Sequence, residues 1–161
     1  MRFLAGCLLA AAGGVVLTQN SQELHSRYGE PDMERFTVRS GISLTVEYGP
    51  DHLACKFLIA PTKPFDPSDP VGSFSTIPST TVAEILDEIV PRSTRGKETP
   101  GSEIASSCMN EMESFDYDSA LIVRSMIGCK SSKPQQENHA TVWLKRDTCP
   151  KPKLPWTVTP R

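Results

Sequence analysis

The chain lacks the short catalytic motifs that mark many enzyme classes. Its 161 residues contain no GxSxG elbow, no HExxH, no P-loop and no GxGxxG. Neither CxxC nor HxxxH spacing occurs, so no pair of metal ligands is preorganised by sequence. The sequence therefore predicts no cofactor, no metal and no catalytic residue.

A strong excess of charge of either sign is also missing. There are 17 Lys and Arg residues against 19 Asp and Glu residues, which argues against nucleic acid or an anionic membrane as the main partner. The charges are unevenly placed, because residues 98–118 hold six acids and no base, whereas 140–161 is mostly basic. We interpret these segments as two solvated surfaces that face each other in the fold. The alternative is a charged docking patch.

No hydrophobic run is long enough to span a bilayer as a helix. The longest, Phe3–Leu17, would cover roughly 22 Å of a hydrocarbon core about 30 Å thick. With Arg2 before it and polar residues after it, the run predicts a signal peptide over residues 1–19 and a secreted or periplasmic protein. Two alternatives are an uncleaved anchor, which alone would place the chain at a membrane, and a lipoprotein modified at Cys7.

Behind this leader, residues 20–149 are expected to form one domain, followed by a Pro-rich flexible tail over 150–161. Apolar residues on even positions predict an antiparallel meander over 34–40, 42–48 and 53–60. A three-residue loop ending at Gly41 would pair Val38 with Ile42 and keep the apolar side chains on one face. The outer face of the meander would carry Arg39, Thr45, Glu47 and Lys56, either solvated or as a docking surface.

Two helices and two further strands complete the prediction. Capping-box spacings open a short helix over 21–28 and a second one near Thr81, which Pro91 ends. Residues 61–79 contain five prolines and predict a long loop, which alternatively serves in binding. Residues 120–128 and 140–146 have the pattern of partner strands. The predicted fold is α+β, with an about five-stranded, mostly antiparallel sheet, two helices on one face and two disulfides.

Four cysteines follow the leader, and they allow three connectivities. If 120–128 and 140–146 form a hairpin, Cys129 and Cys149 lie roughly 25 Å apart, too far for a bond. This geometry favours Cys108–Cys149 together with Cys55–Cys129.

Several side chains have a functional interpretation beside the structural one. Arg92 and Arg95 lie in a predicted loop, where they are either solvated or able to bind an anion. Trp143 has the parity of the outer face and is a candidate contact residue, unless a helix or the tail covers it. The acids at 111–118 lack the glycine turn of a calcium loop, so a solvated acidic segment is favoured over calcium binding.

The run RYGEPDMERFTVRSGISLTVEYGPDHLAC resembles a stretch found in uncharacterised secreted bacterial proteins. Its order of helix, Gly-x-Pro and antiparallel meander, over roughly residues 22–60, resembles small outer-membrane assembly lipoproteins and β-lactamase-inhibitor-like proteins. Those groups are binding or structural modules, so the resemblance implies a non-enzymatic role in the bacterial envelope. It transfers no functional residue to this chain.

Together these features predict an extracytoplasmic binding or structural module whose partner is a protein or an envelope component. A small secreted hydrolase is the first alternative, with a site built from His52 or His139 and the acids at 111–118. The second is a membrane-tethered domain.

Overall fold

The computed structural model describes residues 21–63, 75–99, 103–106, 110–127 and 136–152. The chain divides into two compact units, residues 1–30 and 31–161. In the first unit, the described part is helix α1 (Ser21–Tyr28), and it ends where Gly29, at a φ of +87°, donates its N–H to the carbonyl of His25. This helix confirms the prediction for 21–28, since glycine adopts a positive φ without the strain that a side chain would add.

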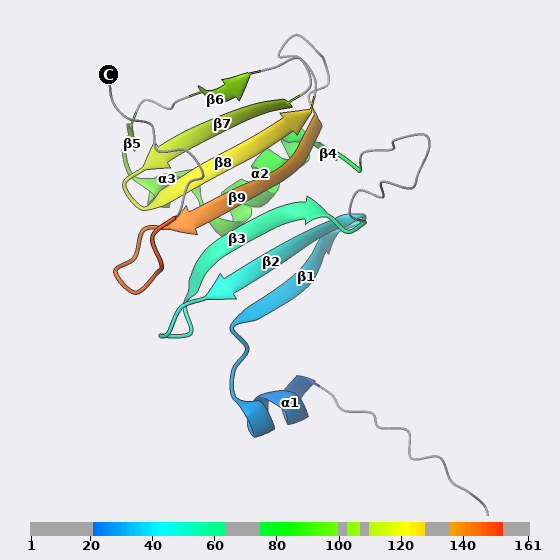
Figure 1. The fold of residues 1–161 in the computed structure, drawn as a ribbon, viewed down its shortest axis with the longest axis vertical. Helices are drawn as coiled ribbons and strands as arrows, with labels where there is room; N and C mark the ends of the chain where they lie inside the picture. The colour runs from blue at the N-terminus through cyan, green and yellow to red at the C-terminus, as the bar shows by residue number, and fades with distance from the viewer. Residues whose placement is uncertain (1–20, 64–74, 100–102, 107–109, 128–135, 153–161) are drawn as a thin grey trace, which may run out of the picture. The chain divides into compact units, whose positions relative to one another are not determined.

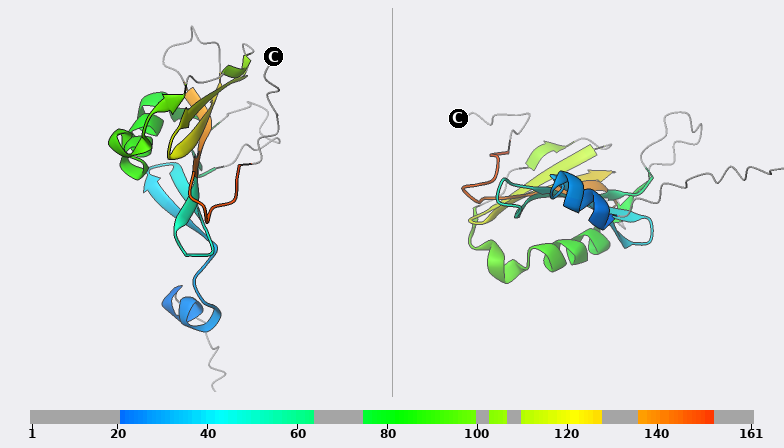
Figure 2. Two further views of the ribbon diagram at one scale, coloured as in Figure 1. Left: turned by 90° about the vertical axis from the view of Figure 1, so that its left-hand side faces the viewer. Right: turned by 90° about the horizontal axis from the view of Figure 1, so that it is seen from below.

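The second unit is a single antiparallel sheet with helices on one side (Figures 1 and 2). Its described strands are β1 (Met33–Arg39), β2 (Ile42–Tyr48), β3 (Ala54–Pro61), β4 (Ile77–Pro78), β5 (Glu98–Thr99), β6 (Glu103–Ser106), β7 (Asn110–Tyr117), β8 (Ala120–Ile127) and β9 (Gln136–Leu144). The main order is β1-β2-β3-β9-β8-β7-β5, with β4 beside β9 and β6 beside β7. Helices α2 (Ser79–Ile89) and α3 (Arg92–Arg95) lie together on one face (Figure 2).

The core lies between this sheet face and α2. Val82, Ile85 and Leu86 of α2 are buried against inward-facing residues of β2, β3, β8 and β9, among them Ile59 and Val142, which have no exposed surface. Side chains of successive strand residues alternate between the two faces of a sheet. The residues between these core positions therefore lie on the opposite face, which we call the outer face.

The predicted meander is confirmed, although two bulges adjust its register. Phe36 pairs with Leu44, as the three-residue loop requires, and Gly41 has a φ of +75°. At the end of the strand, however, Arg39 pairs with Ile42 in place of Val38, because the register shifts between Thr37 and Arg39. A bulge reverses the facing of the residues beyond it. Arg39 accordingly forms an ion pair with Glu88 of α2, contrary to its prediction as an outer-face residue.

The predicted numbers of strands, helices and disulfides are wrong. The described residues form nine strands, three small helices and one disulfide, so the protein is richer in sheet than the expected five strands and two helices. The mostly antiparallel sheet is confirmed. The sequence pattern does not reveal β7, because NEMESFDY alternates acids with few apolar residues, and α3 replaces an expected loop.

The predicted disulfides are also wrong. Cys55 is bonded to Cys149, with their Cα atoms 5.3 Å apart, so neither Cys108–Cys149 nor Cys55–Cys129 can form. The hairpin of β8 and β9 does exist, but β9 also pairs with β3 through Lys56 and Trp143. Because β3 and β9 are antiparallel, the end of β9 lies beside the start of β3, where Cys55 is located. Cys108 and Cys129 lie outside the described residues, as do the predicted leader and most of the predicted tail.

Candidate functional site

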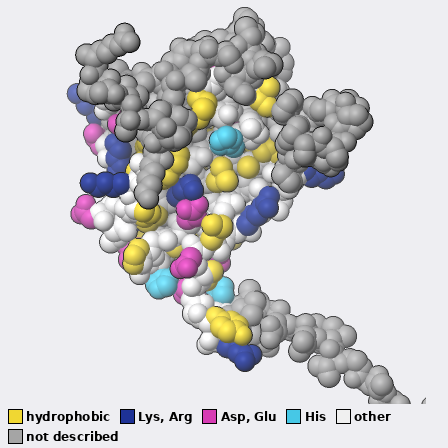
Figure 3. Space-filling model, viewed as in Figure 1, with side chains coloured by type: hydrophobic (Ala, Val, Ile, Leu, Met, Phe, Trp, Pro, Cys, Tyr) yellow, Lys and Arg dark blue, Asp and Glu magenta, His cyan; other side chains and the backbone are white. Residues whose placement is uncertain are grey.

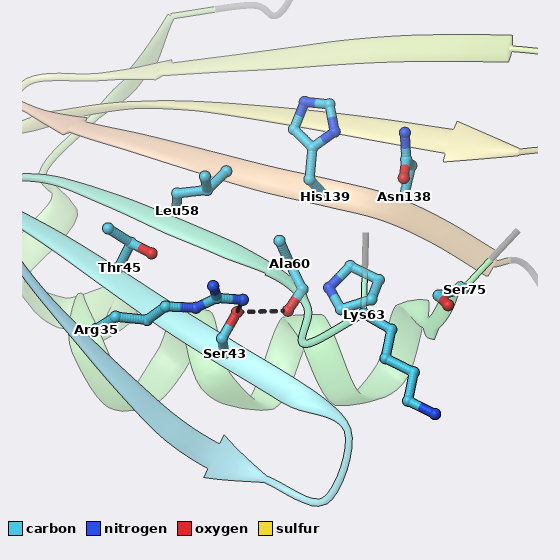
Figure 4. Close-up of a pocket in the computed structure, with 10 residues that line it drawn as sticks. Arg35, Ser43, Thr45, Leu58, Ala60, Lys63, Ser75, Asn138 and His139 are labelled. Atoms are coloured by element: carbon cyan, nitrogen blue, oxygen red, sulfur yellow. Dashed lines mark hydrogen bonds between the residues drawn. The ribbon is translucent and has the colours of Figure 1, made fainter. Parts of the chain in front are cut away.

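The outer face of the sheet contains a hollow of about 480 Å³, which we call the outer-face hollow (Figure 4). It lies over β1, β2, β3 and the first half of β9, on the side away from α2. The residues lining it are Arg35, Ser43, Thr45, Leu58, Ala60, Pro61, Lys63, Ser75, Asn138 and His139. None of them belongs to the hydrophobic core cluster. The fold therefore does not need these side chains to fill its interior.

Strand pairing explains how residues distant in sequence come together here. Ser43 pairs with Ala60 and Thr45 with Leu58, while Leu58 pairs with Thr141 on the other side of β3. Each pair shares one face of the sheet, because residues directly opposite each other in a ladder point the same way. Figure 3 shows this side of the molecule, where hydrophobic side chains gather over the strands with Lys and Arg near them.

A chain of hydrogen bonds fixes one wall of the hollow. Arg35 donates from Nη2 to Ser43 Oγ at 3.0 Å and to the Thr62 carbonyl at 3.4 Å. Ser43, which is buried, in turn donates from Oγ to the carbonyl of Ala60 at 3.1 Å (Figure 4). All three acceptors are neutral. The guanidinium is thus oriented by the sheet without being neutralised by it.

His139 lies on β9 at the upper side of the hollow in Figure 4 and is partly buried. Burial disfavours the charged imidazolium and lowers the pKa of His139 below its usual value. In the described part of the chain, no hydrogen bond or ion pair joins this imidazole to a serine or a carboxylate. It offers a neutral hydrogen-bonding group, but the described residues supply no acid to orient it as a base.

The structure separates the acids at 111–118 from both histidines of the hydrolase alternative. Glu113 pairs with Arg124 on the α2 side of β7, opposite His139, whereas Asp116 lies on the outer face but forms an ion pair with Lys145. His52 lies in the exposed turn between β2 and β3, at a φ of +57°. That turn leads into β3, and β9 and β8 lie between β3 and β7. At normal strand spacing β3 and β7 are therefore roughly 14 Å apart.

These acids are not arranged as a calcium site either. Asp118 accepts a hydrogen bond from the N–H of Lys97 at 2.7 Å, and Asp116 forms an ion pair with Lys145. Since strand residues alternate, the acids of β7 are divided between its two faces. In the ranges that the structure describes, no cluster of three or more His, Cys, Asp or Glu side chains could hold a metal.

The predicted contact residues have different environments. Arg92 is exposed and paired with Asp87, with Nε 3.1 Å from Oδ2. Arg95 is buried: it donates to the Val90 carbonyl at 2.9 Å, pairs with Asp87 and lies 5.7 Å from the ring centre of Tyr117. It anchors α3 to the sheet and is not available to an external anion.

Trp143 pairs with Lys56 and Leu121 on the outer face, as its parity predicts, and is partly exposed. Thr45, also predicted for this face, lines the hollow, and Lys56 pairs with Glu47 at 2.6 Å. Sequence reasoning does not single out Arg35 or Ser43. Both occupy polar positions of alternating strands, but only the register shows that they meet.

No protein family, curated protein or solved structure matches this chain. None of the helices formed by the described residues is long and apolar enough to cross a membrane. The disulfide between Cys55 and Cys149 fits an extracellular or periplasmic location.

Proposed function

We propose that this protein is an exported, non-catalytic binding module that recognises its partner with the outer face of its sheet. The observation that carries the proposal is the outer-face hollow, which gathers polar and apolar side chains from four strands outside the core. A concave surface with a few oriented polar groups is the usual form of a binding site. The described residues place no nucleophile and oriented base together there, which favours binding over hydrolysis.

Export is supported by two independent features. The apolar stretch from Phe3 to Leu17 has the length and flanks of a signal peptide. The Cys55–Cys149 disulfide fits a compartment in which such bonds form and persist. Intact-mass measurement of the protein from its native host tests this part: we expect an N-terminus near residue 20, and a full-length mass with reduced cysteines would contradict it.

Partner binding is tested with two matched substitutions. Thr45→Arg places a bulky cation in the hollow, whereas Thr80→Arg makes the same change at an exposed position of α2 on the opposite face. The immobilised proteins are exposed to envelope and culture-fluid extracts of the native host, and captured components are identified by mass spectrometry. Thr80→Arg should retain a specific component that Thr45→Arg loses.

Equal capture by both variants would show that the hollow is not the recognition surface. Circular dichroism and thermal melting of each variant provide the folding control. An Arg in the first turn of α2 costs only about 0.3–1 kcal/mol through the helix dipole, so Thr80→Arg should fold.

A further inference from the structure

The two cations at the hollow have no carboxylate partner among the described residues, unlike six other Arg or Lys side chains of the second unit. Six Arg or Lys side chains in the described ranges are paired with carboxylates, through Arg39–Glu88, Lys56–Glu47, Arg92–Asp87, Arg95–Asp87, Arg124–Glu137 and Lys145–Asp116. Arg35 instead donates to a hydroxyl and a carbonyl, and Lys63 has no carboxylate partner among the described residues. Two positive charges therefore border one hollow, and no carboxylate of the described residues is paired with either.

The arrangement of Arg35 suits it to receive an external anion. Its Nη2 is occupied by Ser43 and Thr62, which leaves Nε and Nη1 as donors. Because Ser43 is held by Ala60, the guanidinium is oriented before any ligand arrives. A preoriented donor loses less side-chain entropy on binding than a free one.

The remaining lining favours a ligand that is only partly charged. Leu58, Ala60 and Pro61 form an apolar wall, and Asn138 adds an amide. Burial keeps the His139 imidazole neutral near pH 7, so the described groups of the hollow carry the charges of Arg35 and Lys63 alone. A volume of about 480 Å³ lies within the range of sites for small organic ligands.

We propose that the outer-face hollow binds a carboxylate ligand, with its charged end at Arg35 and its apolar body against Leu58, Ala60 and Pro61 (Figure 4). This inference rests on the proposed function, because it names the chemistry that the binding surface recognises. The carboxylate is either that of a free organic acid or the C-terminus of a peptide. Both sources share the same charged group and differ in what is attached to it.

Isothermal titration calorimetry on the full chain with its disulfide formed tests the proposal. The probes are octanoate, 1-octanol, octyl phosphate, and acetyl-Ala-Ala-Leu with either a free or an amidated C-terminus. We expect at least one carboxylate probe to bind at least tenfold more tightly than its uncharged counterpart. Whether octanoate or the free tripeptide binds more tightly identifies the source of the carboxylate.

Two substitutions on the same strand provide the structural control. Arg35→Met removes the charge at the hollow but keeps much of the side-chain stem, whereas Arg39→Met removes an arginine that is paired with Glu88 on the α2 side. Arg35→Met should weaken carboxylate binding by about tenfold or more, since it removes hydrogen bonds from a charged donor to a charged acceptor. Arg39→Met should leave the affinity within about twofold of the wild type.

Tighter binding of octyl phosphate than of both carboxylate probes would overturn the inference, as would the absence of a preference for the carboxylate in both the octyl and the tripeptide pairs, or no binding of any probe. These results would leave the proposed function standing if Thr45→Arg still abolished capture of the native partner. Equal capture by Thr45→Arg and Thr80→Arg would instead contradict the proposed function itself.

Discussion

Cys55 at the start of β3 is bonded to Cys149 beyond the end of β9, across 94 residues of sequence. The same corner is tied by Asp51, which accepts hydrogen bonds from the Leu53 N–H at 3.1 Å and from Thr148 Oγ at 2.8 Å. Strands β3 and β9 carry much of the outer-face hollow. The disulfide thus fastens together the two strands on which the candidate site is built.

Loss of this disulfide should destabilise the protein substantially. Because it closes a long loop, Cys55→Ser with Cys149→Ser should lower the free energy of unfolding by about 2–5 kcal/mol, measured by urea denaturation. A peptide map of the non-reduced protein checks the pairing independently. A map that joins Cys55 to Cys108 or to Cys129 would refute this part of the structure.

The ion pair between Arg124 and Glu137 should be far more important for stability than the exposed pairs. Glu137 is fully buried and accepts a hydrogen bond from Arg124 Nε at 3.0 Å, while Arg124 also donates to the Ser79 carbonyl at 3.3 Å. Glu137→Gln leaves a largely buried guanidinium without its counter-charge, at a cost of about 3–5 kcal/mol.

The matched control is Glu88→Gln, which breaks an exposed pair with Arg39 and should cost about 0–1 kcal/mol. Chemical denaturation of both variants decides the prediction. Similar losses in the two would mean that Glu137 is more solvated than its position indicates.

His139 should make stability depend on pH below neutrality. Its pKa is lowered in the folded protein, so the unfolded chain takes up a proton first as the pH falls below about 6.5. Stability is therefore unaffected by this group at higher pH and decreases as the pH falls from about 6.5 toward the folded-state pKa. His139→Gln should reduce the loss of stability over that range, as followed by thermal melting from pH 7.5 to 5. An unchanged slope would show that the imidazole is not desolvated.

The hydroxyl of Tyr48 should ionise at an abnormally high pH. Its hydroxyl donates to Glu34 Oε2 at 2.6 Å, and this hydrogen bond is the main cause that raises the pKa of Tyr48 to about 12. Ultraviolet titration should show one tyrosinate appearing well above pH 10, absent from Tyr48→Phe and moved toward 10 in Glu34→Gln. The stabilisation from this bond is present below pH 10 and is lost as the pH rises through 12.

Much of the predicted fold follows from apolar residues that recur at every second position. They indicate strands β1, β2, β3, β8 and β9, because apolar residues at alternate positions must share a face. The period-two pattern does not identify strand β7, because acids occupy positions on both of its faces and hydrophobicity does not indicate which face is buried. Strands β4 and β5 have two residues each, which is too few to show any period.

The candidate site is harder to predict from the sequence than the strands are. Predicting Thr45 on the outer face needs only parity, but bringing Arg35, Ser43 and His139 together needs the pairing of β3 with β9. That pairing joins segments about 80 residues apart, and no local pattern specifies it. The wrong disulfides have the same origin, since Cys55 and Cys149 become neighbours only through this contact.

Whether the outer face is the binding surface can be decided by a ¹H–¹⁵N NMR titration of the full chain with octanoate. We predict saturable shifts confined to amides around the hollow, such as those of Ser43, Ala60 and His139, with α2 unaffected. Saturable shifts that map to α2 and leave the amides around the hollow unchanged would contradict it.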